Sequence, residues 1–508
     1  MESATSTKPH LVLFPWTGTI SHVIPMTDLA CLLASHGADV TIVTTPVNAA
    51  IAQGRVDRFT AEPAHAAAGI TVTAIPFPGA DAGLPEGCER LDLIRSPDDV
   101  PRFFAANKAH GEAVARHCLR LRLRLRDAPR RPPSCVISGM CQTWALGVAR
   151  DLGVPCYVFH GFGAFAMLCI ERLYEHRPHE AAASPDERFD VPDLPPPLVC
   201  RGLTSRQLPP HFMPPASVGG KALQGMREFD RAADGVVVNT FEELERGSAA
   251  LLAEATGKKV VAVGSVALCR SPGLDTPQSM SDDARRCMAW LDGKEPRSVV
   301  YVSFGSAGRM PPAQLMQLGM ALVSCASPVL WIIKGADSLP GDVKEWLRDN
   351  TDGDGVASSK CLVVRGWAPQ VAILAHPAVG GFMTHCGWGS TLEAVAAGVP
   401  MATWPFFAEQ FINERLVVDV LGIGVSVGVT KPTENVFTAA NAADGGEAVA
   451  EVVGMEQVKK ALEALMDHGP EGEERRKKAQ ELKLKAKGAL EEGGSSYNNL
   501  ENLIQSFA

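Results

Sequence analysis

The feature that most constrains the fold of this 508-residue chain is its repeated alternation of short apolar runs with stretches that favour helix. Such runs are typical of strands buried on both faces of a parallel sheet, with helices as the crossovers. The predicted strands form two sets. The first covers residues 10–16, 39–45, 70–77, 134–138, 155–161, 235–240 and 259–266, and the second covers 298–306, 329–334, 362–367, 379–384, 401–405 and 424–427. We therefore expect an α/β protein of two doubly wound, Rossmann-like domains with a ligand crevice between them.

Residues 367–410 are the most informative stretch, because polar side chains cluster where a strand passes into a helix. The strand run ends just before His385, and a helix-forming run begins just after Ser390. Unpaired backbone N–H groups and the helix dipole favour a phosphate there, and both side chains add donors. Glu393 suits the two hydroxyls of a ribose, and Trp367 offers a face on which a base can stack. Each residue alone is more often structural, but together they predict a nucleoside diphosphate site.

The same stretch resembles the 44-residue donor-binding signature of plant family 1 UDP-sugar-dependent glycosyltransferases of small molecules, without a gap. The resemblance implies the GT-B architecture, with the active site between the two domains. It implies that Trp367 stacks on uracil, that Glu393 holds the ribose hydroxyls, and that His385 and Ser390 hold the diphosphate. The other positions carried over are Ala368 and Gln370 near the base and ribose, Ser306 at the diphosphate, and Trp388, Glu409 and Gln410 at the sugar.

Two positions in this signature bear on the donor. A terminal Gln, here Gln410, is associated in the family with glucose rather than galactose. Where the family usually has Asn, this chain has Gly389, which removes a side-chain amide from the phosphate and sugar side of the donor-binding turn. The resemblance thus implies UDP-glucose as co-substrate, and the set of donors needs no metal ion or other cofactor.

His22 is the candidate general base. We predict a helix at residues 22–36, with Pro25 in its first turn, so that His22 faces the crevice from the carboxyl end of the first strand. The pattern alone leaves a catalytic base and a helix-capping histidine near even. The resemblance favours the base, because Phe14, Pro15, His22 and Pro25 match the family's catalytic-histidine segment apart from one inserted residue.

Gly139 is the main departure from the family. The predicted strand before it typically ends in an Asp that orients the catalytic histidine, and in triad enzymes such an Asp is worth several orders of magnitude in rate. Three explanations stay open: His22 acts alone on an acidic acceptor, another group substitutes, or activity has been lost. We favour the first, because a phenol with a pKa of about 10 needs less help than an aliphatic alcohol.

The resemblance implies an inverting transferase that moves glucose from UDP-glucose to a hydroxyl of a small apolar acceptor. Phenolics such as flavonoids rank ahead of terpenoid or steroid alcohols, and Met140, Phe162, Phe406 and Phe407 suggest an apolar, aromatic-tolerant acceptor pocket. Carbon glycosylation of electron-rich phenols is the alternative within the family. A catalytically silent UDP-sugar binding protein and a nucleotide-sugar epimerase are the alternatives from other classes.

The net charge and the cysteine count indicate which partners and which cellular compartment to expect. A formal net charge of −9 argues against a nucleic-acid or anionic-membrane partner, and 13 cysteines without metal-ligand spacing fit a reducing compartment. No signal peptide or transmembrane segment is evident, so we expect a cytoplasmic protein, and a monomer. Asp352-Gly353-Asp354 is similar to the metal-nucleotide motif of the other major glycosyltransferase fold, but its Gly-rich surroundings favour a solvent turn.

The domain boundaries follow from composition and from the resemblance. We expect an N-terminal acceptor-binding domain at residues 1–268, a linker at 269–283 with Ser, Pro and Gly, and a C-terminal UDP-sugar-binding domain at 284–490. By family analogy the last helix, within residues 491–508, packs back on the first domain.

Overall fold

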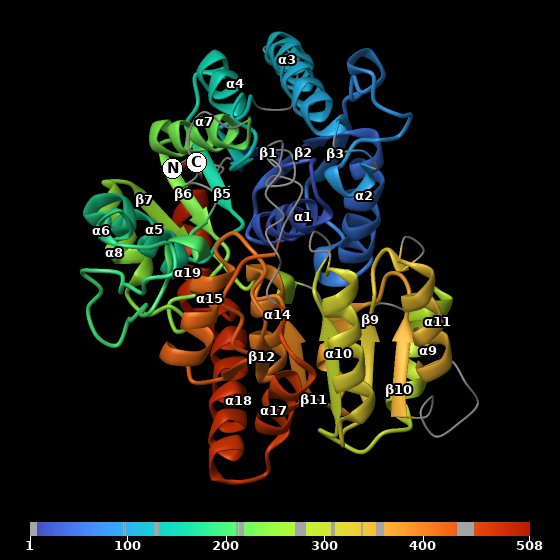
Figure 1. Cartoon of the computed structure of the whole chain (residues 1–508). Helices are drawn as coiled ribbons and strands as arrows, with labels where there is room; N and C mark the ends of the chain where they lie inside the picture. The colour runs from blue at the N-terminus through green and yellow to red at the C-terminus, as the bar shows by residue number, and fades with distance from the viewer. Residues whose placement is uncertain are drawn as a thin grey trace.

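Two parallel sheets, one in each half of the chain, organise the computed structural model (Figure 1). The structure describes residues 8–94, 96, 98–125, 132–209, 212, 218–269, 281–305, 310–336, 339–351, 360–433 and 452–507. Within these ranges the predicted class is confirmed: both sheets are fully parallel, and helices cover them on both faces. Three predictions fall partly or wholly outside these ranges, namely Ser306, Asp352-Gly353-Asp354 and most of the linker at 269–283.

The first sheet has seven strands in the order β3-β2-β1-β4-β5-β6-β7. Alternate residues of its strands face opposite layers of helices: α1, α2 and the carboxyl-terminal α19 cover one face, and α3, α4, α7 and neighbouring helices cover the other. The strands are β1 His10–Phe14, β2 Asp39–Thr44, β3 Ile70–Ala74, β4 Cys135–Gly139, β5 Cys156–His160, β6 Gly235–Val238 and β7 Lys259–Ala262. The helices are α1 Ile20–Ser35, α2 Pro46–Thr60, α3 Asp99–Leu125, α4 Ala145–Leu152, α5 Ala164–His176, α6 Pro178–Ala181, α7 Val218–Ala232, α8 Ser248–Thr256 and α19 Ser495–Gln505.

The second sheet has six strands in the order β10-β9-β8-β11-β12-β13. The strands are β8 Val299–Ser303, β9 Val329–Ile332, β10 Cys361–Val364, β11 Val379–Thr384, β12 Met401–Thr403 and β13 Gly424–Ser426. The helices are α9 Asp282–Asp292, α10 Pro312–Ser324, α11 Gly341–Thr351, α13 Gln370–Ala375, α14 Trp388–Ala397, α15 Gln410–Arg415, α17 Met455–Met466 and α18 Pro470–Leu490. In each sheet the strand order reverses once, between β1 and β4 and between β8 and β11, and ligands of such sheets bind at these points.

The two halves contact each other closely. The large core cluster of the second sheet also contains Phe165 and Phe241 from the first half. After α18 the chain returns to the first half, where the Ser496 hydroxyl of α19 donates to the Gly264 carbonyl at 2.6 Å (Figure 1).

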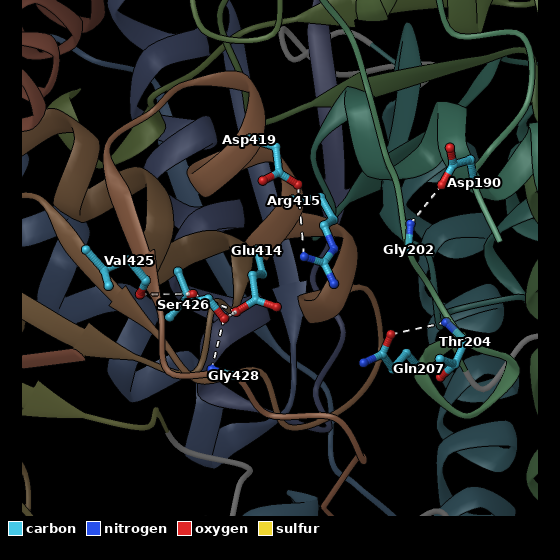
Figure 2. Close-up of polar contacts among 11 residues, drawn as sticks. Asp190, Gly202, Thr204, Gln207, Glu414, Arg415, Asp419, Val425, Ser426 and Gly428 are labelled. Carbon is cyan, nitrogen blue, oxygen red and sulfur yellow. Dashed lines mark hydrogen bonds and ion pairs between the residues drawn. The ribbon is translucent and has the colours of Figure 1, made fainter. Parts of the chain in front are cut away.

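Irregular segments of both halves also meet. Gln207 accepts from the Thr204 backbone N–H at 3.2 Å (Figure 2). Its amide donates to the Thr430 carbonyl of the second half at 3.1 Å. Within the second half, the buried carboxylate of Glu414 accepts a hydrogen bond from the Ser426 hydroxyl at 2.8 Å (Figure 2).

Two predicted helix starts are corrected. The helix α1 begins at Ile20 instead of residue 22, because the Thr19 carbonyl already accepts from the backbone N–H of His22 at 3.1 Å. Pro25 is therefore its sixth residue and lies beyond the first turn. The helix α14 begins at Trp388, so that Ser390 belongs to its first turn.

Candidate active site

The turn between β11 and α14 holds the ring of His385 between two glycines. A Cβ atom at Gly305 would lie 2.5 Å from Cε1 of His385, and one at Gly387 would lie 2.4 Å from its Nε2, so that neither position has room for a side chain. Nδ1 is buried and has no hydrogen-bond partner among the described residues. Burial, and to a lesser extent the charge of Lys334, lower the pKa of His385 to about 4. The imidazole is therefore neutral at pH 7 and has one N–H to donate.

This turn lies where the strand order of the second sheet reverses. Gly305 follows β8 and His385 follows β11, the two central strands, and α14 points its amino end at the same place. Lys334 follows the next strand, β9, and acts on His385. It brings a positive charge to the site that the sequence reasoning missed, although its place after a strand beside the reversal point could have indicated it.

The residues predicted at the base and ribose come together. Gln370, the first residue of α13, donates to the Ser390 hydroxyl at 2.9 Å and to Oε2 of Glu393 at 2.7 Å. Trp367 lies just before this cluster with 57% of its surface exposed, while Ala368 is buried. An exposed indole beside a carboxylate is the arrangement that a stacked base and its ribose would require.

The residues predicted at the sugar lie at the start of α14 and α15. Glu409 is buried, accepts from Asn413 at 3.3 Å, and has its pKa raised to about 7 by burial. The side-chain oxygen of Gln410 accepts from the backbone N–H of Phe406 at 2.8 Å and of Phe407 at 3.1 Å. Gln410 therefore has its amide N–H₂ left as the group that it could offer a sugar hydroxyl.

Trp388 and Gly389 are neighbours in the chain, but the first is buried and the second is exposed. The indole N–H of Trp388 donates to the Asn239 carbonyl of the first half at 2.8 Å, and the residue is only 2% exposed. Its side chain thus joins the two halves, and its N–H is not free for a sugar. Gly389 is exposed, and a Cβ atom there would have nothing within 4 Å.

His22 lies in the first turn of α1 and keeps partial exposure to solvent. Its ring meets the ring of Trp16 edge-on, with centroids 4.9 Å apart and an interplanar angle of 87°. Burial lowers its pKa to about 4, with His160 as the lesser cause. No side chain among the described residues hydrogen-bonds the His22 ring, so the structure shows no group in the orienting role.

Gly139 ends β4 and faces the backbone of Trp16. A Cβ atom at position 139 would lie 3.0 Å from the Trp16 nitrogen and 3.4 Å from its Cβ. An Asp at this position would meet Trp16 before it approached His22.

A cavity of about 240 Å³ lies in the first half between α5, α7 and α8. Met140 and Phe162 line it, as predicted for the acceptor pocket, together with His160, whose Nε2 is 2.9 Å from Asp230 Oδ1. Gly161 lies between two of these lining residues, and a Cβ atom there would be 3.0 Å from Cε1 of His22. The wall of the cavity at His160 and Phe162 is therefore joined in the chain to a residue that lies against His22.

The placement of Phe406 in the acceptor pocket is corrected. Phe406 is 1% exposed and stacks on Phe304 with centroids 5.2 Å apart, in the core beside His385. Phe407 is partly exposed next to it, and neither residue is among the described residues that line the cavity. Both are apolar residues in a strand-to-helix connection, a pattern that does not distinguish a core position from a pocket wall.

In the part of the chain that the structure describes, no three His, Cys, Asp or Glu side chains gather in a way that would hold a metal ion. No described helix is long and apolar enough to cross a membrane.

Comparison with known families and proteins agrees with this geometry. The family model of UDP-glucoronosyl and UDP-glucosyl transferase matches residues 279–448. UDP-glycosyltransferase 73C6 of Arabidopsis thaliana is 39% identical over 500 residues, which are 98% of this chain and 96% of that protein. UDP-glycosyltransferase 73D1 of the same plant is 39% identical over 511 residues, with coverages of 98% and 96%.

Solved structures share the fold across the whole chain. Glycyrrhiza uralensis UGT73P12, complexed with glycyrrhetinic acid 3-O-monoglucuronide, superposes with a TM-score of 0.83 at 33% identity and covers 99% of this chain and 96% of its own. A UDP-glucosyltransferase from Polygonum tinctorium capable of glucosylating indoxyl has a TM-score of 0.71 at 25% identity and 99% coverage of both chains.

Proposed function

The chain belongs to the plant family 1 UDP-glycosyltransferases, and from that premise we propose that it transfers glucose from UDP-glucose to a hydroxyl of a small, largely apolar acceptor with inversion. The observation that carries the proposal is the cluster of Gln370, Ser390 and Glu393 beside the exposed Trp367. The exposed indole can stack on a base, the carboxylate can bind a ribose, and the amino end of the helix can bind a diphosphate. UDP has these three parts in the same order.

The donor is held by groups that suit an anion. The amino end of α14, the neutral His385 and the Ser390 hydroxyl donate to the diphosphate, and Lys334 adds a positive charge nearby. Ser306 belongs to this set by family resemblance. Glu409 and the amide of Gln410 bind the sugar hydroxyls. These donors stabilise the leaving UDP without a metal ion, so that a chelator should leave the rate unchanged.

In the chemical step His22 takes the proton of the acceptor hydroxyl while its oxygen attacks the anomeric carbon. The bond between that carbon and the diphosphate oxygen breaks, and UDP carries away the electron pair. Since attack and departure occur on opposite faces, the configuration at the anomeric carbon is inverted.

The acceptor must be acidic enough for a weak base. A histidine whose pKa is about 4 draws a proton far more readily from a phenol, with a pKa of about 10, than from an aliphatic alcohol. Phenolics such as flavonoids therefore rank first, and terpenoid or steroid alcohols second. Carbon glycosylation of electron-rich phenols remains the alternative, because it also depends on an acidic ring hydroxyl.

The test is UDP release from UDP-glucose with a set of phenols, followed by product analysis for oxygen and carbon linkage. Acceptor-dependent release of UDP with an oxygen-linked glucoside is the expected result. A carbon-linked product would replace the proposed linkage, and conversion of UDP-glucose without any acceptor would contradict transfer altogether. We expect a cytoplasmic monomer, in keeping with 13 cysteines that form no disulfide.

A further inference from the structure

The cavity of the first half has a polar outer end that the proposed transfer does not use. At its inner end, near the carboxyl edge of the sheet, Met140, His160 and Phe162 form the wall. Further out, between α5 and α7, the wall is formed by Glu171, Tyr174 and Arg227.

Arg227 is the distinctive group at this outer end. Its guanidinium lies on the ring of Tyr174, with Cζ 3.0 Å from the centroid, and this contact fixes its plane. Oε2 of Glu171 is 4.0 Å from Nη2, which is too far for a hydrogen bond. Nη1 is buried and has no partner in the described part of the chain, although the side chain keeps 19% exposure. Burial lowers the pKa of Arg227, as expected for an incompletely compensated cation.

Among the charged residues that line the wall, cations outnumber carboxylates. The cations are Arg227, Arg231 and Lys258, the carboxylates are Glu171 and Asp230, and Asp234, outside the wall, also acts on Lys258. Asp230 is already paired with His160, and its backbone carbonyl accepts from Lys258. An additional carboxylate is therefore the group that would complete this end of the cavity.

The helix α5 gives the distance between the two ends. It begins at Ala164, next to Gly163, where a Cβ atom would lie 2.8 Å from the Trp388 ring of the donor-binding half. Glu171 lies seven residues further along α5, which corresponds to about 10 Å at 1.5 Å per residue. The end of the cavity at Glu171 thus lies about 10 Å along α5 from the contact with the Trp388 ring.

We propose that Arg227 is an acceptor-positioning residue that pairs with a carboxylate at the end of the acceptor remote from the hydroxyl that receives the sugar. The inference rests on the proposed function for the hydroxyl end. A guanidinium binds a carboxylate through two parallel hydrogen bonds, which fix the orientation of the acceptor as well as its affinity. The acceptor class is thus an elongated apolar hydroxy acid whose body contacts Met140, Phe162 and Met167.

The experiment compares 4′-hydroxybiphenyl-4-carboxylic acid with its carboxamide, which has the same length and no charge. Binding of each to the full chain in the presence of UDP is measured by titration calorimetry. We expect the acid to bind the wild type about tenfold more tightly than the amide, in line with a charge-assisted hydrogen bond. Arg227→Met should abolish this preference, and Arg227→Lys should keep part of it, which also shows that the loss does not come from misfolding.

Arg231→Met is the matched control, since Arg231 lines the same cavity one turn further along α7. Equal binding of acid and amide to the wild type would overturn the inference. So would an undiminished preference in Arg227→Met, or an equal loss in Arg231→Met. Preferential binding of the acid without UDP release from UDP-glucose would instead contradict the proposed function and leave the role of Arg227 supported.

Discussion

Gly139 and Gly389 both stand where the family resemblance implies a polar side chain, but their surroundings differ. A side chain at position 389 would enter open space, whereas one at 139 would press on the backbone of Trp16. A side chain can therefore be added at position 389 without crowding, whereas one at position 139 requires the Trp16 backbone to shift.

Gly389→Asn should lower the KM for UDP-glucose. The amide adds a donor on the diphosphate and sugar side of the turn, and a hydrogen bond to a charged group is worth roughly tenfold in affinity. Initial rates against donor concentration measure the effect. Gly389→Ala is the control, because it shares the gain in helix propensity without the amide. Equal KM values for the Asn and Ala variants would show that the amide does not reach the donor.

Gly139→Asp should lower the melting temperature without extending the acceptor range to aliphatic alcohols. The new Cβ would meet the Trp16 nitrogen at 3.0 Å, closer than ordinary contact, and the carboxylate would have no clear approach to His22. Thermal unfolding and UDP release with a phenol and an alcohol test this, with Gly139→Ala to isolate the crowding. Turnover of alcohols by a fully stable Asp variant would refute the steric account.

Among the helices, α5 has a cap, the carboxylate of Glu245, that makes the stability of the protein depend on pH. Its carboxylate accepts from the backbone N–H of Ala164 at 3.0 Å and of Phe165 at 2.8 Å, and so caps α5. Burial raises its pKa to about 7, above the ordinary value of 4.5 for a glutamate. The folded protein therefore holds this proton more tightly than the unfolded chain, and the stability gained from it is lost as pH rises from 4.5 through 7.

Glu245→Gln should remove this pH-dependent loss. The melting temperature of the Gln variant minus that of the wild type is expected to increase from pH 4.5 to pH 7. The altered cap can shift this difference by a constant amount, but it does not change its slope with pH. Thermal unfolding across that range measures the slope of the difference. Glu254→Gln, at an exposed position on α8, is the matched control. A flat difference between Glu245→Gln and wild type would contradict the linkage.

Most strands could be predicted from sequence because buried apolar runs carry the signal directly. The predicted strand at 379–384 matches β11, and the run at 134–138 differs from β4 by one residue. The start of α1 was missed because a backbone carbonyl, that of Thr19, determines it. Backbone hydrogen bonds of this kind leave no trace in residue type.

Across the whole chain, Trp388 joins the two halves that carry the two sheets. Its N–H bond to the Asn239 carbonyl links residues 149 positions apart in the chain. The family resemblance places Trp388 at the sugar, whereas its N–H donates to the other half of the chain. The sequence could not show the direction of the indole, because that depends on how two separately folded sheets meet.

Trp388→Phe should weaken the contact between the halves. The ring is kept, but the buried Asn239 carbonyl loses its donor, at a cost of about 1–3 kcal/mol in the free energy of unfolding. We expect a lower melting temperature and a higher KM for UDP-glucose. Trp290→Phe is the control, since the Trp290 N–H has no partner among the described residues. Equal effects of both substitutions would argue against a specific role of the interdomain bond.

The central claim is that a partly covered, neutral His22 without an orienting Asp serves as the base for acidic acceptors. The most direct test is the rate of UDP release from UDP-glucose with phenols of graded pKa, for wild type and His22→Ala. We expect a loss of about 10²–10⁴-fold in His22→Ala, smallest for the most acidic phenol. Undiminished release in His22→Ala across the series would contradict it and show that the acceptors arrive already ionised.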